Sequence, residues 1–428
     1  MRHTKLVIIG AGSASFGLAT LCDVVTTPEL AGSTISLVDV DSQALDAVST
    51  VARKMNDASG AGLTVESTTD RARALPGAEF VLISIAVRRN ELWKLDWEIP
   101  LKHGVRHTLG ENGGPGGLFH CMRNIPIILD ICHDIERLCP SALVLNFTNP
   151  VSRVSMAVDR HSSVKAVGLC HGIGGQLHRL AEVPGTASDN LDAKAAGLNH
   201  FTWILDLRFK DSGEDAYPEL RRRLREHDPA FQPLSRKLFE THGFYPSPGD
   251  DHIGEYLSWA TEYCPMHGYN FEAAERYKAE TWERIRRIVS GDEPVDDLVK
   301  RRSGERALAI IAGILSNSNH VELAVNVPNN GSISNLPDDA IVEVPAVVSG
   351  AGVSPLRMDT LPAGIASLCA TQIGVQGLAV EAAVTGSRDL ALQALLADPV
   401  IRSAKAAEAI LDELLILETE HLPQFRRP

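Results

Sequence analysis

The sequence lacks any run of about 18 consecutive apolar residues, which is the length that a membrane-spanning helix needs. Glycines interrupt the short apolar stretch in the opening segment "MRHTKLVIIGAGSASFG", so we expect a first strand there and not a signal peptide. Low-complexity tracts and internal repeats are also missing. At 428 residues the chain is long enough for roughly two or three packed lobes. We therefore expect a globular protein without a membrane partner.

The seven cysteines have no regular spacing, and basic residues are not in excess. The odd cysteine count argues against a disulfide framework and favours a reducing cytoplasm. Lys and Arg number 41 against 54 Asp and Glu, a net charge of −13, whereas binding to a phosphate backbone needs clustered cations. We therefore expect no nucleic-acid partner, and we interpret the basic run "RRRLR" at 221–225 as a solvated helix face.

A glycine-rich turn follows the first predicted strand. The strand is "KLVIIG" (5–10), the turn is "GAGSASFG" (10–17), and helical spacing begins after it. Gly10 permits a tight turn, Gly12 lets the backbone approach a pyrophosphate, and the helix N-terminus supplies amide donors to that anion. The spacing departs from G-x-G-x-x-G because Ser15 replaces the third glycine. The residues expected to contact a dinucleotide are Gly10, Gly12, Ser13, Ser15 and Phe16.

An acidic residue ends the second predicted strand. In "TISLVDVD" (34–41), Asp39 is placed to accept hydrogen bonds from ribose hydroxyls, which favours NAD over NADP. Further strands are predicted at 78–86 and 141–151, with helical stretches alternating between them. This alternation predicts an α/β fold with a Rossmann-type doubly wound parallel sheet. A strand–turn–helix unit that binds no ligand is the alternative interpretation.

Two later segments are candidates for the substrate site. The glycines and proline of "GENGGPGG" (110–117) disfavour a helix or strand interior, so a helix is predicted to begin near Leu118. The segment is either a sugar- or anion-binding loop near the nicotinamide or a plain surface loop. "NFTNPV" places Asn149 at a strand end, where open α/β sheets bind ligands. Pro150 biases Asn149 toward an extended conformation and leaves an amide that suits a polyol, although a ligand-free turn is the alternative.

A thiol and an imidazole occupy two further turns. Cys170 ends a predicted strand in "GLCHG", and His200 precedes another in "GLNHFTW". If the two turns meet, these side chains can share a divalent metal and leave coordination positions open for substrate oxygens. The alternatives are a buried cysteine that acts as a small hydrophobe and a hydrogen-bonded histidine.

The motifs "GAGS", "LGENGGPGG", "NFTNP", "GLCHG" and "GLNHFTW" occur in an order that resembles glycoside hydrolase family 4. "NVPNNGSISNLPDDAIVEVP" (326–345) is similar to the C-terminal region of that family. The resemblance covers nearly the whole chain. It implies a Rossmann domain over 1–195 and an α+β domain over 196–428 that is similar to lactate and malate dehydrogenases. It also implies NAD and a divalent metal, commonly Mn²⁺, as cofactors, a glycoside substrate, and a homodimer or homotetramer.

The resemblance also implies roles for individual residues. Cys170 and His200 fall on the family's metal-ligand positions, and Asn149 falls on a residue that holds the sugar. Members specific for 6-phospho-sugars carry an acidic Asp directly after the metal Cys, whereas this sequence has His171 there. That departure implies an unphosphorylated α-galactoside, α-glucoside or α-uronide as substrate, with His171 as a candidate proton carrier.

The proton-abstracting base of the family is a Tyr or an Asp. In the matching segment "YPSPGDDHIGEY" we predict Asp250 as the base, and Asp251, His252 and Tyr256 are alternatives. The implied route is oxidation at sugar C3 by NAD, removal of the C2 proton, elimination of the C1 leaving group, addition of water, and re-reduction. The metal stabilises the developing enediolate as a Lewis acid.

Four further polar residues are candidates on position alone. Arg89, after the third strand, can anchor a substrate carboxylate, and Arg123 opens the helix after the glycine-rich segment. For both arginines, a solvated surface position is the alternative. Asn326 and Asn330 are candidate substrate contacts, with a structural turn as the alternative.

Two other functions remain open from the sequence. A 2-hydroxy-acid dehydrogenase of the lactate/malate type shares the fold and the Asn-Pro turn, but it needs an Asp–His proton relay and paired arginines that we do not find at suitable spacing. A non-catalytic NAD-sensing protein is the other alternative. It would bind NAD without turnover and tolerate Cys170→Ser.

Overall fold

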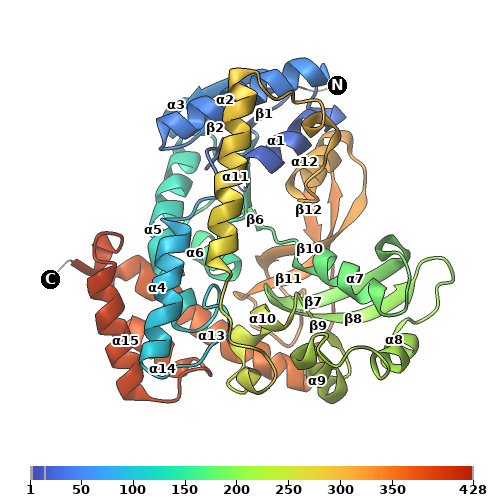
Figure 1. Ribbon diagram of the computed structural model, residues 1–428, viewed down its shortest axis with the longest axis vertical. Helices are drawn as coiled ribbons and strands as arrows, with labels where there is room; N and C mark the ends of the chain where they lie inside the picture. Colours follow the sequence, from blue (N-terminus) through green and yellow to red (C-terminus); the bar gives the residue numbers. More distant parts are fainter. Residues whose placement is uncertain (1–2, 14–15, 427–428) are drawn as a thin grey trace.

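A computed structural model describes residues 3–13 and 16–426 of the chain, so the predicted dinucleotide contact Ser15 lies outside the described residues. Twelve strands within the described part form one sheet (Figure 1). The strands are β1 (Lys5–Ile9), β2 (Thr34–Val38), β3 (Thr64–Thr68), β4 (Phe80–Ile83), β5 (Leu143–Asn146), β6 (Lys165–Gly168), β7 (Leu191–Leu198), β8 (Phe201–Phe209), β9 (Tyr245–Ser247), β10 (His320–Pro328), β11 (Ile341–Ser349) and β12 (Gly352–Pro355). Their order is β3-β2-β1-β4-β5-β6-β10-β11-β7-β8-β9, and β12 pairs with β11.

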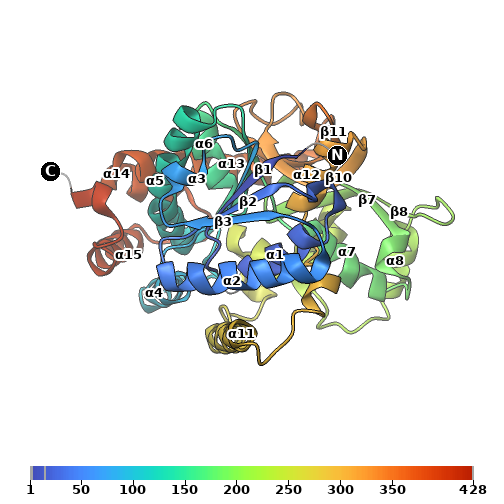
Figure 2. The same ribbon diagram turned by 90° about the horizontal axis from the view of Figure 1, so that it is seen from above.

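Helices cover both faces of this sheet (Figure 2). They are α1 (Gly17–Val25), α2 (Ser42–Ser59), α3 (Arg71–Ala74), α4 (Arg89–Lys102), α5 (Gly114–Leu138), α6 (Val151–His161), α7 (Gly172–Glu182), α8 (Tyr217–Leu224), α9 (Pro233–His242), α10 (Asp250–Ile253), α11 (Phe271–Ser290), α12 (Ala307–Ser316), α13 (Ala363–Thr385), α14 (Arg388–Ala397) and α15 (Ala404–Leu417).

The first six strands are parallel and confirm the predicted doubly wound sheet. Strand β1 shows why helices cover both faces, because its apolar side chains point alternately to the two faces of the sheet. Leu6 and Ile8 pack in one hydrophobic core with residues of α1 and α2, whereas Val7 and Ile9 pack in another with α5 and α6. Figure 2 shows α1 and α2 on one side of β1–β3 and α5 and α6 on the other.

The strands that follow β6 in the chain extend the same sheet with antiparallel pairings. Strand β10 pairs with β6, and the sheet continues through β11, β7, β8 and β9. The predicted domain boundary after residue 195 falls inside β7, so a division before Leu191 would keep the β7–β8 hairpin whole. The division into two domains itself stays a prediction.

Helix α5 begins at Gly114 and not near the predicted Leu118. Glycine allows this start because the helix N-terminus packs against its own preceding loop. A side chain at Gly116 would collide with the backbone carbonyl of Gly110. The whole glycine-rich segment is buried, so the alternative of a plain surface loop is wrong.

Helix α13 is long and apolar enough to cross a membrane by length and composition alone. Half of its most apolar 18-residue window is buried, and the helix packs against α5, α6 and α14. A core helix passes the same test of length and composition, so α13 is weak support for a membrane span.

Arg123 neither lies on the surface nor faces a substrate. Its guanidinium is buried and forms ion pairs with Asp96 at 2.5 Å and Glu418 at 2.6 Å. Glu418 lies 295 residues further along the chain. The Arg123 cluster, which we define as Arg123, Asp96 and Glu418, therefore ties the segment after α15 to α4 and α5.

We predict that Arg123→Met lowers the free energy of unfolding by about 3–5 kcal/mol, because two buried carboxylates lose their counter-charge. The matched control is Arg388→Met, which breaks an exposed ion pair with Asp412 and should cost less than about 1 kcal/mol. Urea unfolding followed by circular dichroism measures both. Equal losses in the two variants would contradict a buried structural role for Arg123.

Candidate active site at the carboxyl edge of the sheet

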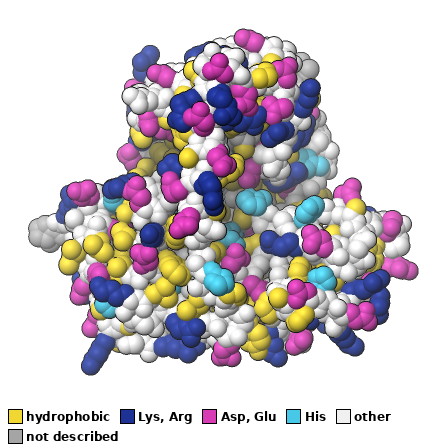
Figure 3. Space-filling view, in the orientation of Figure 1, with side chains coloured by type: hydrophobic (Ala, Val, Ile, Leu, Met, Phe, Trp, Pro, Cys, Tyr) yellow, Lys and Arg dark blue, Asp and Glu magenta, His cyan; other side chains and the backbone are white. Residues whose placement is uncertain are grey.

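The loops that follow β1, β4, β5 and β6 all open at one edge of the sheet, because these strands are parallel. They carry four of the residues selected from the sequence, namely Gly10, Arg89, Asn149 and Cys170. Figure 3 shows histidine side chains gathered near the middle of the face that Figure 1 presents. The fold thus assembles the predicted motifs at the edge where open α/β sheets bind ligands.

The turn after β1 has the geometry of a dinucleotide cradle. Gly10 has φ +90°, and a side chain there would collide with the Ser84 carbonyl. The Gly12 amide donates to Asp39 Oδ2 at 2.7 Å, and a Cβ on Gly12 would lie only 2.8 Å from that oxygen. Ser13 Oγ accepts from the Phe16 amide at 3.2 Å. The turn and the acid at the end of β2 therefore lie together, as a pyrophosphate and a ribose require.

Cys170 and His200 meet at this edge. Cys170 Sγ lies 3.2 Å from His200 Nε2, although 30 residues separate them in the sequence. Cys170 follows the end of β6, and His200 lies in the two-residue turn between β7 and β8 with φ +58°. A left-handed backbone is uncommon for histidine, so the surrounding structure must hold this turn in place.

Burial keeps both groups of this pair neutral. It raises the pKa of the Cys170 thiol to about 12, and nearby Glu343 raises it further, while the Gly172 amide and the Asn199 side chain lower it. Burial also holds the pKa of His200 well below its usual value. Neutral imidazole is the form that binds metals, and a cation would have to displace the thiol proton.

A second donor set lies beside His200. The imidazoles of His200 and His252 are 4.2 Å apart between ring centroids, and ligand atoms of these two residues and Glu255 lie within 4.8 Å of one another. His200 Nδ1 is buried and has no hydrogen-bond partner, whereas His252 Nδ1 lies 3.7 Å from Glu255 Oε2. The sequence pointed to His252 only as an alternative base and did not point to Glu255.

Glu255 also holds the glycine-rich segment. Its Oε1 accepts from the backbone amides of Glu111 at 2.5 Å and Asn112 at 2.9 Å. A Cβ on Gly113 would lie 2.8 Å from the Glu255 Cβ. The segment after β4 is therefore fixed against α10 and the residues that follow it.

Glu111 joins two residues that the sequence predicted for substrate binding. Its Oε1 accepts from Arg89 Nη2 at 3.0 Å and from Asn149 Nδ2 at 3.2 Å. Burial alone would raise the pKa of Glu111, but the positive charge of Arg89, together with His252 and other histidines, lowers it to about 2. Glu111 was visible in the quoted motif, yet only the fold reveals that Arg89 and Asn149 converge on it.

The three predicted catalytic residues have different surroundings. The His171 side chain is 73% exposed, and its Nδ1 lies 3.2 Å from Glu305 Oε1, an interaction that raises its pKa. Tyr256 is buried against Phe201, with ring centroids 5.0 Å apart, and burial raises its pKa well above the usual value. His171 is therefore the more accessible of these two.

Asp250 caps a helix. Its Oδ2 accepts from the Leu234 amide at 2.8 Å, and its Oδ1 accepts from the Ser235 amide at 2.8 Å and the Ser235 hydroxyl at 2.6 Å. These groups form the N-terminus of α9, where a carboxylate is stabilising. The hydrogen bonds fit a structural role, and the role of Asp250 as the base stays a prediction.

Asn330 lies beyond Asn326 in the direction away from Cys170. Strand β10 runs antiparallel to β6 with Asn326 opposite Gly168, so the chain after Asn326 moves away from Cys170. Asn330 is exposed in a turn, where its amide donates to the Asp338 carbonyl at 3.1 Å. The hydrogen bond fits the turn interpretation, and substrate contact by Asn330 stays a prediction.

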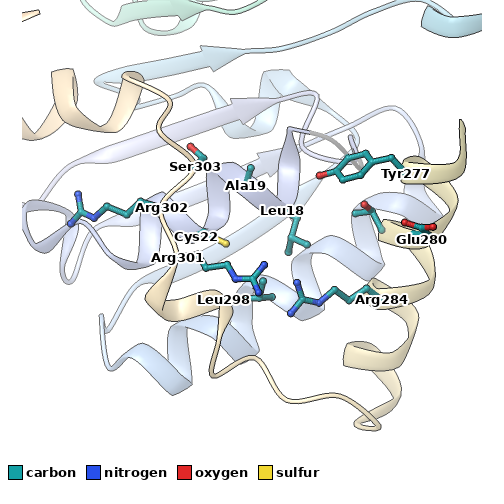
Figure 4. A pocket seen from close by; sticks show the side chains of 11 residues that line it. Leu18, Ala19, Cys22, Tyr277, Glu280, Arg284, Leu298, Arg301, Arg302 and Ser303 are labelled. Carbon is teal, nitrogen blue, oxygen red and sulfur yellow. The ribbon is translucent and has the colours of Figure 1, made fainter. Parts of the chain in front are cut away.

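A cavity of about 320 Å³ lies between α1, α11 and the segment that follows α11 (Figure 4). None of the predicted site residues lines it. Arg284 beside it is paired with Glu293 and Asp297, and Arg302 donates to the Thr26 carbonyl. Arg284 and Arg302 are therefore engaged by the protein itself.

Comparison with known proteins decides the family. A sequence profile described as family 4 glycosyl hydrolase matches residues 5–185, and the profile of that family's C-terminal domain matches residues 195–401. The chain belongs to glycosyl hydrolase family 4. The family predicted from the motifs is therefore confirmed.

Relatives of this family 4 hydrolase carry several specificities. An α-glucosidase from Erwinia rhapontici is 38% identical over 96% of this chain and 97% of its own length. An α-galactosidase from Rhizobium meliloti is 33% identical, covering 99% of this chain and 90% of its own. Both alignments run through nearly the whole molecule, so the likeness includes both halves of the sheet.

Solved structures share the fold. A 6-phospho-α-glucosidase from gut microorganisms, in complex with NAD and Mn²⁺, superimposes with a TM-score of 0.87 at 21% identity and covers 99% of this chain and 100% of its own. A malate dehydrogenase from Cryptosporidium parvum superimposes with a TM-score of 0.54 at 15% identity, covering 90% and 99% of the two chains. The predicted relation to the malate dehydrogenase fold is confirmed.

We predict that Glu111 makes the family 4 hydrolase sensitive to acid. Because its folded pKa of about 2 lies below the usual 4.5, its stabilising contribution is present above pH 4.5 and is lost as the pH falls toward 2. Between pH 7 and pH 3 the loss amounts to about 2 kcal/mol.

Urea unfolding at these two pH values tests this loss. Glu111→Gln has no carboxyl group to protonate. Its free energy of unfolding should therefore fall by about 2 kcal/mol less between pH 7 and pH 3 than that of the natural protein. An equal decrease in the free energy of unfolding in both proteins would show that Glu111 does not titrate in this way.

Proposed function

We propose that this family 4 hydrolase cleaves an unphosphorylated α-glycoside with the help of bound NAD and a divalent cation such as Mn²⁺. The observation that carries the proposal is the 3.2 Å approach of Cys170 Sγ to His200 Nε2, at the same sheet edge as the Gly10–Gly12 turn. The names of the two relatives support an α-glycoside, and the NAD and Mn²⁺ of the structural relative support the cofactors.

The residues present fit both cofactors. The Gly12 backbone leaves no room for a side chain beside Asp39, so a pyrophosphate can approach while the carboxylate remains available to ribose hydroxyls. Sulfur and neutral imidazole are a donor pair for a transition-metal dication. When bound, NAD accepts and returns a hydride, and the cation polarises the adjacent sugar oxygens as a Lewis acid.

The surrounding side chains would bind and orient the sugar. Asn149 offers an amide and Glu111 a carboxylate oxygen, and both groups suit sugar hydroxyls. Arg89 keeps Glu111 ionised, and its guanidinium lies over Trp93 at 5.1 Å from the ring centroid, which fixes its orientation. Glu255 holds the backbone of the segment that carries Glu111.

Proton transfer needs an accessible group. We propose His171 as the proton carrier because it is exposed, follows Cys170 directly, and has a carboxylate partner in Glu305. Asp250 and Tyr256 remain candidates for the base at C2. For Asp250 to act, its carboxylate must exchange its hydrogen bonds at the N-terminus of α9 for a position beside the sugar.

A neutral sugar fits the site better than a uronide. The sequence made Arg89 a candidate anchor for a substrate carboxylate, but its guanidinium is bound to Glu111. A uronate at this position would face the ionised Glu111 carboxylate, and like charges repel. We therefore propose an α-glucoside or α-galactoside.

The cellular setting and assembly are also proposals. All seven cysteines are free in the structure, and a thiol that binds metal must stay reduced, which supports a reducing cytoplasm. We expect a homodimer or homotetramer and no nucleic-acid or membrane partner.

Nitrophenyl α- and β-glycosides, including uronides and 6-phosphates, test the activity when NAD, Mn²⁺ and a thiol reductant are each omitted in turn. We predict release of nitrophenol from a neutral α-glycoside without net formation of NADH. Removal of the cation should lower kcat on the order of 100-fold or more, because Lewis-acid stabilisation contributes several kcal/mol. Cys170→Ser should lose activity similarly, whereas the matched control Cys369→Ser, at a buried cysteine that is not among the site residues, should not.

Each alternative has its own signature in this assay. Accumulation of NADH with a 2-hydroxy acid would indicate a dehydrogenase. Binding of NAD without turnover of any glycoside, and with Cys170→Ser tolerated, would indicate a sensing protein. Exchange of the C2 hydrogen with solvent deuterium is expected for the elimination route, and its absence during turnover would contradict that route.

A further inference from the structure

A single row of residues joins the two halves of the sheet. Gly168 of β6 pairs with Asn326 of β10, Asn326 pairs with Glu343 of β11, and Glu343 pairs with Gly197 of β7. The described pairings of β6 with β10 and of β11 with β7 consist of this one position each. We call these four residues the seam. Cys170 lies two residues beyond one end of the seam.

The two central side chains of the seam are polar and buried. Glu343 Oε1 accepts from Asn326 Nδ2 at 3.1 Å, and Asn326 Nδ2 also donates to the Gly168 carbonyl at 3.3 Å. Apolar residues are the usual choice at such positions, and a buried polar group is costly unless hydrogen bonds satisfy it. Both end positions are too crowded for a side chain. A Cβ on Gly168 would lie 2.6 Å from Val151 Cγ1 and 3.0 Å from the Asn326 Cβ, and a Cβ on Gly197 would lie 2.6 Å from the Phe201 carbonyl oxygen.

The same carboxyl group reaches the turn that carries His200. Glu343 Oε1 accepts from Asn199 Nδ2 at 3.0 Å, and Glu343 Oε2 accepts from the Thr202 hydroxyl. Asn199 and Thr202 flank His200 and Phe201 in the chain. Glu343 is therefore linked through Asn199 and Thr202 to the left-handed turn, and through Asn326 to the end of the strand that leads to Cys170.

We propose that Glu343 is a positioning residue that sets the distance between the Cys170 sulfur and the His200 imidazole. This inference rests on the proposed function, in which these two side chains hold the cation. Glu343 touches neither the cation nor the sugar. It acts through Asn199 and the seam, so that the two ligands are held at a fixed distance although they lie on different halves of the sheet. A slip of one residue at the seam would turn Glu343 to the opposite face and break these contacts.

The test is cation affinity, measured without turnover. Mn²⁺ binding is followed by the electron paramagnetic resonance signal of free Mn²⁺, and Co²⁺ binding by the sulfur-to-cobalt charge-transfer absorption that reports Cys170. We predict that Glu343→Ala weakens Mn²⁺ binding about 10–100-fold, which is typical for groups that orient metal ligands. The charge-transfer band should weaken in parallel, while NAD affinity stays unchanged.

The conservative variant separates shape from charge. In Glu343→Gln the remaining oxygen can still accept from Asn199 and Asn326. The new amide can donate to the Thr202 hydroxyl oxygen, because that hydroxyl can donate its own proton to the Leu198 carbonyl, 2.7 Å away. We predict Mn²⁺ affinity within about threefold of the natural protein, since a neutral hydrogen bond contributes only about 1 kcal/mol. Affinity as weak as in Glu343→Ala would overturn positioning by hydrogen bonds.

Matched variants control for general damage. Glu322 is another buried carboxylate of the sheet, paired with Arg306 at 2.6 Å, so Glu322→Ala should lower the melting temperature without changing cation affinity. If Glu343→Ala does not fold, Asn199→Ala decides the question, with Asn329→Ala as its control. Asn329 is a buried asparagine that holds the turn after β10.

Two further results would count against the inference. Natural Mn²⁺ affinity and an unchanged cobalt band in Glu343→Ala and Asn199→Ala would overturn the positioning role and leave the proposed function standing. Absence of the cobalt band in the natural protein, with Cys170→Ser binding Mn²⁺ equally well, would overturn the proposed cation site and this inference with it.

Discussion

The site depends on the pairing of Gly168, Asn326, Glu343 and Gly197 across four neighbouring strands. At this row the parallel half of the sheet meets the antiparallel half. The parallel half contributes the dinucleotide turn and Cys170, and the antiparallel half contributes His200. Neither half has both members of the thiol–imidazole pair, so the pair exists only when the row is formed. This explains why hydrogen-bonded polar side chains occupy a position in the sheet that would otherwise favour apolar packing.

Buried Glu111 and buried Arg123 each lie beside an opposite charge, because an isolated charge in the interior is very costly. Arg89 forms an ion pair with Glu111. Arg123 forms ion pairs with Asp96 of α4 and with Glu418 in the segment after α15. Cys170 and His200 differ, because burial keeps both neutral. This thiol–imidazole pair is the cation site that we propose.

Local features of the sequence predicted much of this arrangement. The strand, the Gly10–Gly12 turn and Asp39 follow from spacing within about forty residues, and they identify the doubly wound sheet. The pairing of Cys170 with His200 came from the order of motifs typical of the family, since spacing alone left a buried cysteine and a hydrogen-bonded histidine as alternatives. Contacts between distant segments were not predictable. The partner Glu418 of Arg123 and the approach of Glu255 to Glu111 depend on how helices and loops pack. Substrate contact by Asn330 stays a prediction, because a sequence does not tell in which direction a strand leaves the site.

The most direct test of this account is the X-ray absorption spectrum of the Mn²⁺-loaded protein at the manganese edge. The account predicts a sulfur atom bound directly to manganese in the natural protein and its loss in Cys170→Ser, with nitrogen from His200 retained in both. A manganese environment of only oxygen and nitrogen in the natural protein would contradict it.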